Sequence, residues 1–223
     1  MDTSISLMSF GPNIASNLGS ISGIKFNRVH LDYCENYDLK KAIKSIVNAG
    51  LFPDVHIVAA DPTPAINEIL SQTRLPTPTF VQLEPLDKAG ELFWEHNNIQ
   101  PAIMVSSNIH FYENIIQQAE YILIMATTPG VSGGVFDEKT FDVIRIVKAI
   151  NSNIRIYVDG GVNDKNFERL RLLGVHTAVI GSYLSDLTTS MKRQGSLLCD
   201  LDIRLPLLSL SEPIENLPCT QTL

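Results

Sequence analysis

Two histidines and two aspartates are placed where they could bind a cation together. His30 and Asp32 stand near the end of one apolar run, His56 lies in the next run, and Asp159 closes another run further along the chain. Residues two apart in a strand point to the same side, so His30 and Asp32 share a face. Two imidazoles and two carboxylates suit Zn²⁺, Fe²⁺, Mn²⁺ or Co²⁺, and mixed nitrogen and oxygen ligation does not choose among these metals. The alternative is a buried ion-pair network, although two carboxylates in an apolar interior are costly without a cation.

Glycine-bearing turns follow three of the later apolar runs. They hold Gly130, Ser132 and Gly133 in the first turn, Gly160 and Gly161 in the second, and Gly181 with Ser182 in the third. Such turns bring backbone N–H groups and helix N-termini toward a bound anion, and barrels often build a phosphate site from their last loops. A single glycine turn is explained by tight chain reversal alone. Three such loops on one face favour a phosphate site.

The elements that must position these residues alternate along the chain. Eight apolar runs predict strands at 5–10, 25–32, 54–59, 78–84, 102–106, 121–127, 154–159 and 177–182. Helical spacing of apolar residues predicts helices at 38–48, 64–71, 87–97, 108–119, 137–150 and 163–173, the last beginning with Asn163 as N-cap and followed by Gly174. Continuous apolar strands are typical of a parallel sheet covered by helices.

The α/β pattern predicts a single (β/α)₈ TIM barrel over residues 1–187, with a doubly wound open sheet as the alternative. Polar residues fall at the carboxyl ends of the predicted strands, and a barrel gathers those ends onto one face, whereas an open sheet spreads them along an edge. Residues 188–223 depart from the repeat and contain three prolines. We expect a closing helix followed by a C-terminal tail there.

Composition narrows the partners. The chain has 17 Lys and Arg against 24 Asp and Glu, a net charge of −7, which argues against a nucleic-acid or anionic-membrane surface but permits a small anionic substrate. We expect no membrane helix, because no apolar run approaches about 18 residues, and no signal peptide, because the N-terminus lacks a positive region. Three scattered cysteines predict a reducing, cytoplasmic location.

Five stretches in this order and spacing resemble the ribulose-phosphate 3-epimerase family. They are HLDYC (30–34), DVHIV (54–58), PGVSGG (129–134), YVDGGVN (157–163) and VIGS (179–182). The corresponding family stretches read HVDVMDG, DVHLM, NPGFGGQ, VDGGV and VAGSA. The similarity runs from about residue 28 to about residue 184. VDGGV alone occurs in other phosphate-binding barrels, and its combination with the two histidine motifs is more specific.

The resemblance implies a metal-dependent epimerisation of a phosphorylated ketose, ribulose 5-phosphate to xylulose 5-phosphate or a related sugar phosphate. It implies a divalent metal on His30, Asp32, His56 and Asp159, with Asp32 and Asp159 also serving as acid and base on opposite faces of the substrate. A cation would stabilise the enediolate left by proton removal. The phosphate would lie among Gly130, Ser132, Gly160, Gly161, Gly181 and Ser182. Such barrels commonly self-associate, so a homo-oligomer is also expected.

The sequence departs from the family in the residues around these ligands. The loop after HLDYC is several residues short, Cys34 and Val58 replace two methionines while Met125 keeps its place, and a family histidine is absent from VQLE at 81–84. Cys34, Glu84 and Met125 are therefore the candidate residues of a changed substrate pocket. These departures leave open whether the sugar is ribulose 5-phosphate.

Two other functions fit parts of the pattern. Another phosphosugar-barrel isomerase would share VDGG, but such enzymes usually place a lysine at a strand end, and no lysine stands at one here. A non-catalytic paralogue that binds a sugar phosphate would explain the changed surroundings, whereas the four intact ligands oppose it.

Overall fold

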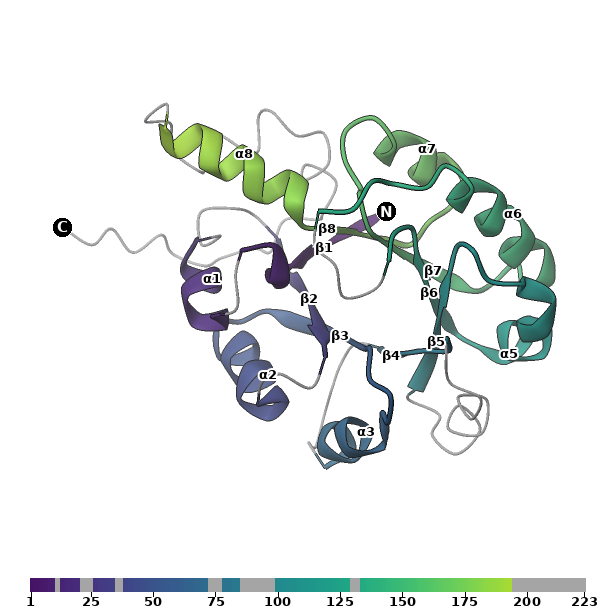
Figure 1. Ribbon diagram of the computed structural model, residues 1–223, viewed down its shortest axis with the longest axis horizontal. Helices are drawn as coiled ribbons and strands as arrows, with labels where there is room; N and C mark the ends of the chain where they lie inside the picture. The colour runs from purple at the N-terminus through teal and green to yellow at the C-terminus, as the bar shows by residue number, and fades with distance from the viewer. Residues whose placement is uncertain are drawn as a thin grey trace.

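Eight parallel strands close into a barrel in the computed structural model, with helices forming a ring outside it (Figure 1). The structure describes residues 1–10, 13–20, 26–34, 38–71, 78–84, 99–128 and 133–193. The strands are β1 Asp2–Ser6, β2 Arg28–Tyr33, β3 Phe52–Ile57, β4 Thr79–Gln82, β5 Ile99–Met104, β6 Tyr121–Met125, β7 Arg155–Asp159 and β8 Thr177–Ile180. The predicted eight strands are confirmed.

Pairing of the first strand with the last decides between the two predicted architectures. β1 runs parallel to β8, with Asp2 opposite Thr177 and Ile5 opposite Ile180. An open sheet would leave both of these edges unpaired, so the (β/α)₈ barrel is confirmed and the doubly wound alternative is wrong. The first strand is also shorter and earlier than predicted, because residues Leu7–Phe10 leave the sheet as a 3₁₀ turn.

The helices alternate with the strands as the apolar spacing predicts. They are α1 Ile14–Ser20, α2 Leu39–Asn48, α3 Thr63–Leu70, α5 Glu113–Gln118, α6 Thr140–Ile150, α7 Phe167–Leu172 and α8 Ser182–Arg193. The predicted helix at 108–119 is divided into the 3₁₀ turn Ile109–Tyr112 and α5. The sequence did not predict α1, and the helix predicted at 87–97 lies outside the described residues. In the described part of the chain, no helix has the length and apolarity needed to cross a membrane.

The boundaries of the last two helices differ from the sequence prediction. Asn163 accepts a hydrogen bond from the Lys165 amide at 2.9 Å, and its own amide donates to Asn166 at 3.0 Å. These contacts form a turn that delays α7 until Phe167, while Gly174 follows the helix with φ +75° as predicted. The closing helix α8 starts at Ser182, inside the range assigned to the barrel, and residues after 193 are not among those described.

The core has two layers, as expected for a strand barrel inside a helical ring. A large cluster of Ile, Val, Leu and Phe lies between the strands and the helices. A smaller cluster fills the barrel interior and consists of Phe80, Ala102, Leu123, Met125 and Tyr157. Tyr157 and Asp159 are two residues apart on β7, so the apolar interior filling and the site carboxylate share the inner face of that strand.

Candidate functional site

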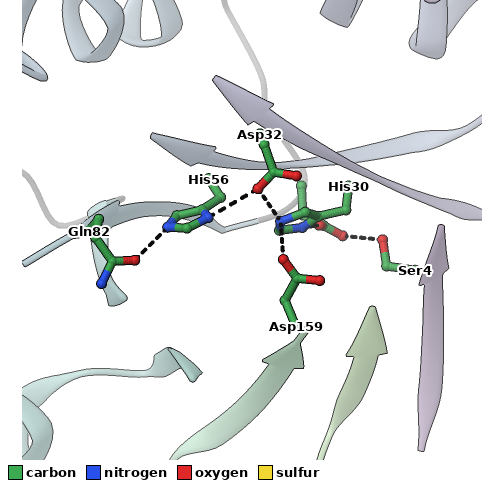
Figure 2. Close-up of polar contacts among 7 residues, drawn as sticks. Ser4, His30, Asp32, His56, Gln82 and Asp159 are labelled. Atoms are coloured by element: carbon green, nitrogen blue, oxygen red, sulfur yellow. Dashed lines mark hydrogen bonds and ion pairs between the residues drawn. The ribbon is translucent and has the colours of Figure 1, made fainter. Parts of the chain in front are cut away.

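Strands β2, β3 and β7 bring four ionisable side chains together at the carboxyl ends of the strands (Figure 2). One nitrogen or carboxylate oxygen from each of His30, Asp32, His56 and Asp159 lies within 4.8 Å of all the others. The β2–β3 register places Asp32 beside His56, and Asp159 approaches from β7. Both histidines are fully buried. The geometry therefore unites the four residues that the sequence singled out as ligands.

The buried imidazole of His30 indicates that this cluster fits a metal ion. Its Nε2 atom has no hydrogen-bond partner among the described residues. The same atom lies 3.5 Å from Asp32 Oδ1 and 3.8 Å from Asp159 Oδ2. A buried polar atom without a partner is costly, and two carboxylates facing it supply the oxygen ligands that accompany imidazole in zinc and transition-metal sites. The four residues can hold a divalent metal.

Asp54 holds the other side of the His30 ring, and the sequence analysis missed it. Its carboxylate pairs closely with Nδ1 of His30 and accepts a hydrogen bond from the Ser4 hydroxyl at 2.8 Å. Arg28 lies 4.0 Å from the same carboxylate. A proton on Nδ1 leaves the Nε2 lone pair directed at the cluster, the arrangement common to metal-binding histidines. The sequence shows only that Asp54 faces the same way as His56, two residues later, whereas the contact with His30 depends on the pairing of β2 with β3.

His56 faces the cluster through its other nitrogen. Its Nδ1 lies 3.2 Å from Asp32 Oδ1, and its Nε2 lies 2.9 Å from Oε1 of Gln82 on β4. Figure 2 shows Gln82 on the far side of the His56 ring from Asp32. The sequence marks Gln82 only as a departure from the family, because its contact with His56 depends on the β3–β4 register.

The pKa values of the two site aspartates, Asp32 and Asp159, are shifted in opposite directions. Burial, reinforced by the negative charge of Asp32, raises the pKa of Asp159 to about 6. Burial also opposes ionisation of Asp32, but the two neighbouring histidines outweigh it and, in the metal-free protein, hold the pKa of Asp32 well below its usual range. Groups this close titrate together, and of the two Asp159 takes up a proton more readily. The two carboxyl groups that face the cavity therefore differ in proton affinity, as a general acid and a general base must.

A cavity of about 660 Å³, including its open mouth, adjoins the cluster. Eight of the predicted site residues line it, namely Asp32, Met125, Gly133, Asp159, Gly160, Gly161, Gly181 and Ser182. Further wall residues, which were not among the predicted site residues, are Ser6, Met8, Ser9, Thr127 and Thr128. Ser6, Met8 and Ser9 were missed because β1 ends at Ser6, whereas the sequence predicted that the strand continues to residue 10.

The other predicted pocket residues lie elsewhere or cannot be placed. Gly130 and Ser132 lie outside the described residues. Cys34 is half-buried after β2 and is not on the wall of this cavity. Glu84 also does not line the cavity, because its carboxylate accepts hydrogen bonds from Ser107 and from the Gln82 side-chain amide.

Glycines let the last loops pack against one another at the cavity wall. Gly161 has φ +64°, and a Cβ atom there would lie 2.9 Å from the Phe136 Cα. Gly160 has φ +107°, and a Cβ atom there would lie 2.8 Å from the Thr127 amide nitrogen. Since backbone cannot move aside as a flexible side chain can, only glycine fits at these two positions.

Gly161→Ala is expected to destabilise the fold more than Gly50→Ala. Gly50 has φ +77°, but a Cβ atom added there would have nothing within 4 Å, so its replacement carries only the left-handed backbone cost of about 1–2 kcal/mol. Crowding at Gly161 should add about 1–3 kcal/mol. Chemical denaturation of both variants measures the difference in unfolding free energy, and equal losses would show that the loops can move apart.

Known proteins with related sequences are ribulose-phosphate 3-epimerases. A ribulose-phosphate 3-epimerase of Helicobacter pylori is 33% identical over 94 residues, covering 40% of this chain and 43% of that protein. One from Encephalitozoon cuniculi is 27% identical over 178 residues, covering 76% of this chain and 80% of that protein. The match to the Helicobacter relative thus spans less than half of that protein's length.

Solved structures support the fold alone. A tryptophan synthase chain from Mycobacterium tuberculosis superposes with a TM-score of 0.61 at 14% identity, covering 91% of each chain. The sequence model of the family described as "Ribulose-phosphate 3 epimerase family" matches residues 32–185, a segment that contains three of the four clustered ligands. The fourth, His30, lies just before it. With a closed barrel, the clustered ligands and this match, the chain belongs to the ribulose-phosphate 3-epimerase family.

Proposed function

We propose that the protein is a metal-dependent epimerase that interconverts ribulose 5-phosphate and xylulose 5-phosphate, or a closely related pair of ketose phosphates. The observation that carries this function is the convergence of two buried imidazoles and two carboxylates beside the cavity, with Nε2 of His30 facing both carboxylates. Membership of the epimerase family supports it. His30, Asp32, His56 and Asp159 would hold the cation.

Inversion at a carbon beside a ketone needs one group to remove a proton and another to return one to the opposite face. Asp32, held ionised by the histidines, is suited to accept the proton. Asp159, with a pKa raised to about 6, is suited to donate one, and the two exchange roles in the reverse direction. When bound, the divalent cation would stabilise the negative charge of the enediolate.

The substrate phosphate would be held at the side of the cavity formed by the loops that follow β6, β7 and β8. Gly133, Gly160, Gly161, Gly181 and Ser182 line that wall, and by the same proposal Gly130 and Ser132 would join them. Helix α8 begins at Ser182 and runs for 12 residues, so its N-terminal amides and dipole face the cavity and favour an anion. A phosphate can therefore be bound by a chain of net negative charge.

The test is solvent deuterium uptake by a panel of pentulose and hexulose phosphates, followed by NMR with metal-reconstituted protein. The expected result is deuterium uptake at the carbon beside the carbonyl, with formation of the epimer, from ribulose 5-phosphate or from a closely related ketose phosphate in the panel. The absence of uptake from every member, with metal demonstrably bound, would contradict the epimerase and favour a sugar-phosphate-binding paralogue.

Asp54→Asn is expected to weaken metal binding about 10–100-fold, the usual effect of removing a group that orients a ligating histidine. The amide lacks the charge that holds the proton on Nδ1 of His30 and can rotate to present its own N–H. Competition with a chromogenic chelator measures the change in affinity. Asp142→Asn, an exposed aspartate paired with Arg145, is the matched control, and equal affinities for the two variants would contradict a role for Asp54.

A further inference from the structure

A line of hydrogen bonds leads from His56, in the candidate metal site, through Gln82 at the end of β4 to Glu84 just beyond that strand. Nε2 of His56 contacts Oε1 of Gln82 at 2.9 Å, and Nε2 of Gln82 donates to Oε2 of Glu84 at 2.6 Å. The Ser107 hydroxyl donates to the other oxygen of Glu84. His56 and Gln82 are buried, with exposures of 0% and 2%. Neither Gln82 nor Glu84 lines the cavity, so both act on the cluster only through their neighbours.

The carboxylate of Glu84 fixes which way the Gln82 amide points. An amide has a donor end and an acceptor end, whereas an ionised carboxylate only accepts. Rotating the amide by a half-turn would bring its oxygen against the Glu84 oxygen at hydrogen-bond distance, a repulsive contact. The stable orientation therefore gives the NH₂ group to Glu84 and leaves the carbonyl oxygen toward His56.

The carbonyl oxygen of Gln82 in turn selects the tautomer of His56. A carbonyl can only accept, so Nε2 of His56 must carry the proton. The Nδ1 lone pair then points toward Asp32 and the cluster, at 3.2 Å from Asp32 Oδ1. His30 is held the opposite way, with Nδ1 on Asp54 and Nε2 toward the cluster.

We propose that Glu84 and Gln82 are positioning residues for the metal site, which set the tautomer of His56 so that its Nδ1 is the ligating atom. The role in metal binding rests on the proposed metal-dependent function, whereas the tautomer of His56 can be measured in the protein without metal. Gln82 stands where the family stretch has a histidine in the same strand, so the pair is this protein's own means of orienting His56.

An exchange of the side chains at positions 82 and 84 tests whether Glu84 orients Gln82 and Gln82 orients His56. Glu84→Gln removes the charge that orients Gln82, and the affinity for zinc should fall about tenfold, at the lower end of effects seen for groups behind a ligating histidine. Gln82→Glu alone places two carboxylates against each other, and its zinc affinity should fall at least as far as that of Glu84→Gln. The double variant Gln82→Glu with Glu84→Gln restores a carboxylate acceptor for His56 and an amide donor behind it. Its affinity should return to within about threefold of the original protein.

The restoration separates positioning from packing. The double variant has the composition and charge of the original chain, and a purely structural role would make two substitutions at least as harmful as one. Ser107→Ala is the control, because it removes another partner of Glu84 while leaving the Gln82–Glu84 contact in place. Its zinc affinity should stay within about threefold of the original. Zinc affinity unchanged in Glu84→Gln, or no recovery in the double variant, would overturn the proposal.

The tautomer is read independently by NMR of ¹⁵N-histidine-labelled protein, with His56 assigned from the spectrum of His56→Ala. A proton on Nε2 in the original chain and in the double variant, and a loss or mixture of that tautomer in Glu84→Gln, supports the inference. A neutral His56 ring with its only proton on Nδ1 in the original chain overturns it. If the protein fails to bind zinc, the proposed function fails while the tautomer of His56 in the metal-free protein still decides this inference.

Discussion

Asp32→Asn and Asp159→Asn should each reduce epimerisation by at least about 10²–10⁴-fold, the usual contribution of a positioned acid or base. Each amide is nearly isosteric with the carboxylate and keeps an oxygen for a metal, but it can neither accept nor deliver the transferred proton. The measurement is epimer formation and solvent deuterium uptake at matched metal occupancy. The exposed variant Asp142→Asn should retain full activity.

The two variants should also differ in a mirrored way. If Asp32 removes the proton from one epimer and Asp159 from the other, each variant retains some deuterium exchange with the epimer whose base it keeps, while forming little product. Each variant is therefore assayed starting from each of the two epimers. Exchange from both epimers in one variant and from neither epimer in the other would show that one group, and not two, handles the proton.

Removal of the metal should have the second large effect, on activity and on stability together. Stripping the protein with a chelator should reduce turnover to the background rate, and Zn²⁺, Fe²⁺, Mn²⁺ or Co²⁺ should restore it to different extents. A cation at a concentration of about 100 times its Kd stabilises the folded state by about 2.7 kcal/mol. For a chain of this size that corresponds to a rise in Tm of roughly 5–10 °C.

A pair of histidine variants assigns that stabilisation to the cluster. His30→Gln should lose both the metal-dependent rise in Tm and the restored activity, because the Nε2 atom that faces both aspartates is gone. His110→Gln should keep both, since the side chain of His110 is 79% exposed and pairs with Glu113. A metal-dependent Tm shift that survives in His30→Gln would place the cation elsewhere.

The positions of the strands and of the inward-facing residues could be predicted because they depend on local pattern. Period-two alternation in β2 places His30 and Asp32 on one face whatever lies beside them. Glycine at 160 and 161 likewise predicts backbone conformations that other residues rarely adopt, and both have positive φ. The end of β1 was misplaced, because the apolar letters continue to Phe10 after the strand pairing has stopped at Ser6.

Roles that depend on neighbouring strands could not be predicted. Asp54 lies beside His30 only because β2 and β3 pair with those two residues in register. Glu84 was expected to face the substrate, but β5 and the segment after it bring Ser107 to its carboxylate and turn it toward Gln82 instead. Register is fixed by many contacts along both strands together, and no short stretch of sequence contains it.

The sequence by itself determined the barrel elements, the four candidate ligands and the glycine loops, because strand periodicity and backbone freedom are properties of single segments. The tertiary structure alone decided that the sheet closes, with β1 against β8. It also decided which nitrogen of each histidine faces the cluster and which aspartate takes up a proton more readily. These features depend on distances of a few ångströms between side chains from different strands, since hydrogen bonding and charge coupling act only over such distances.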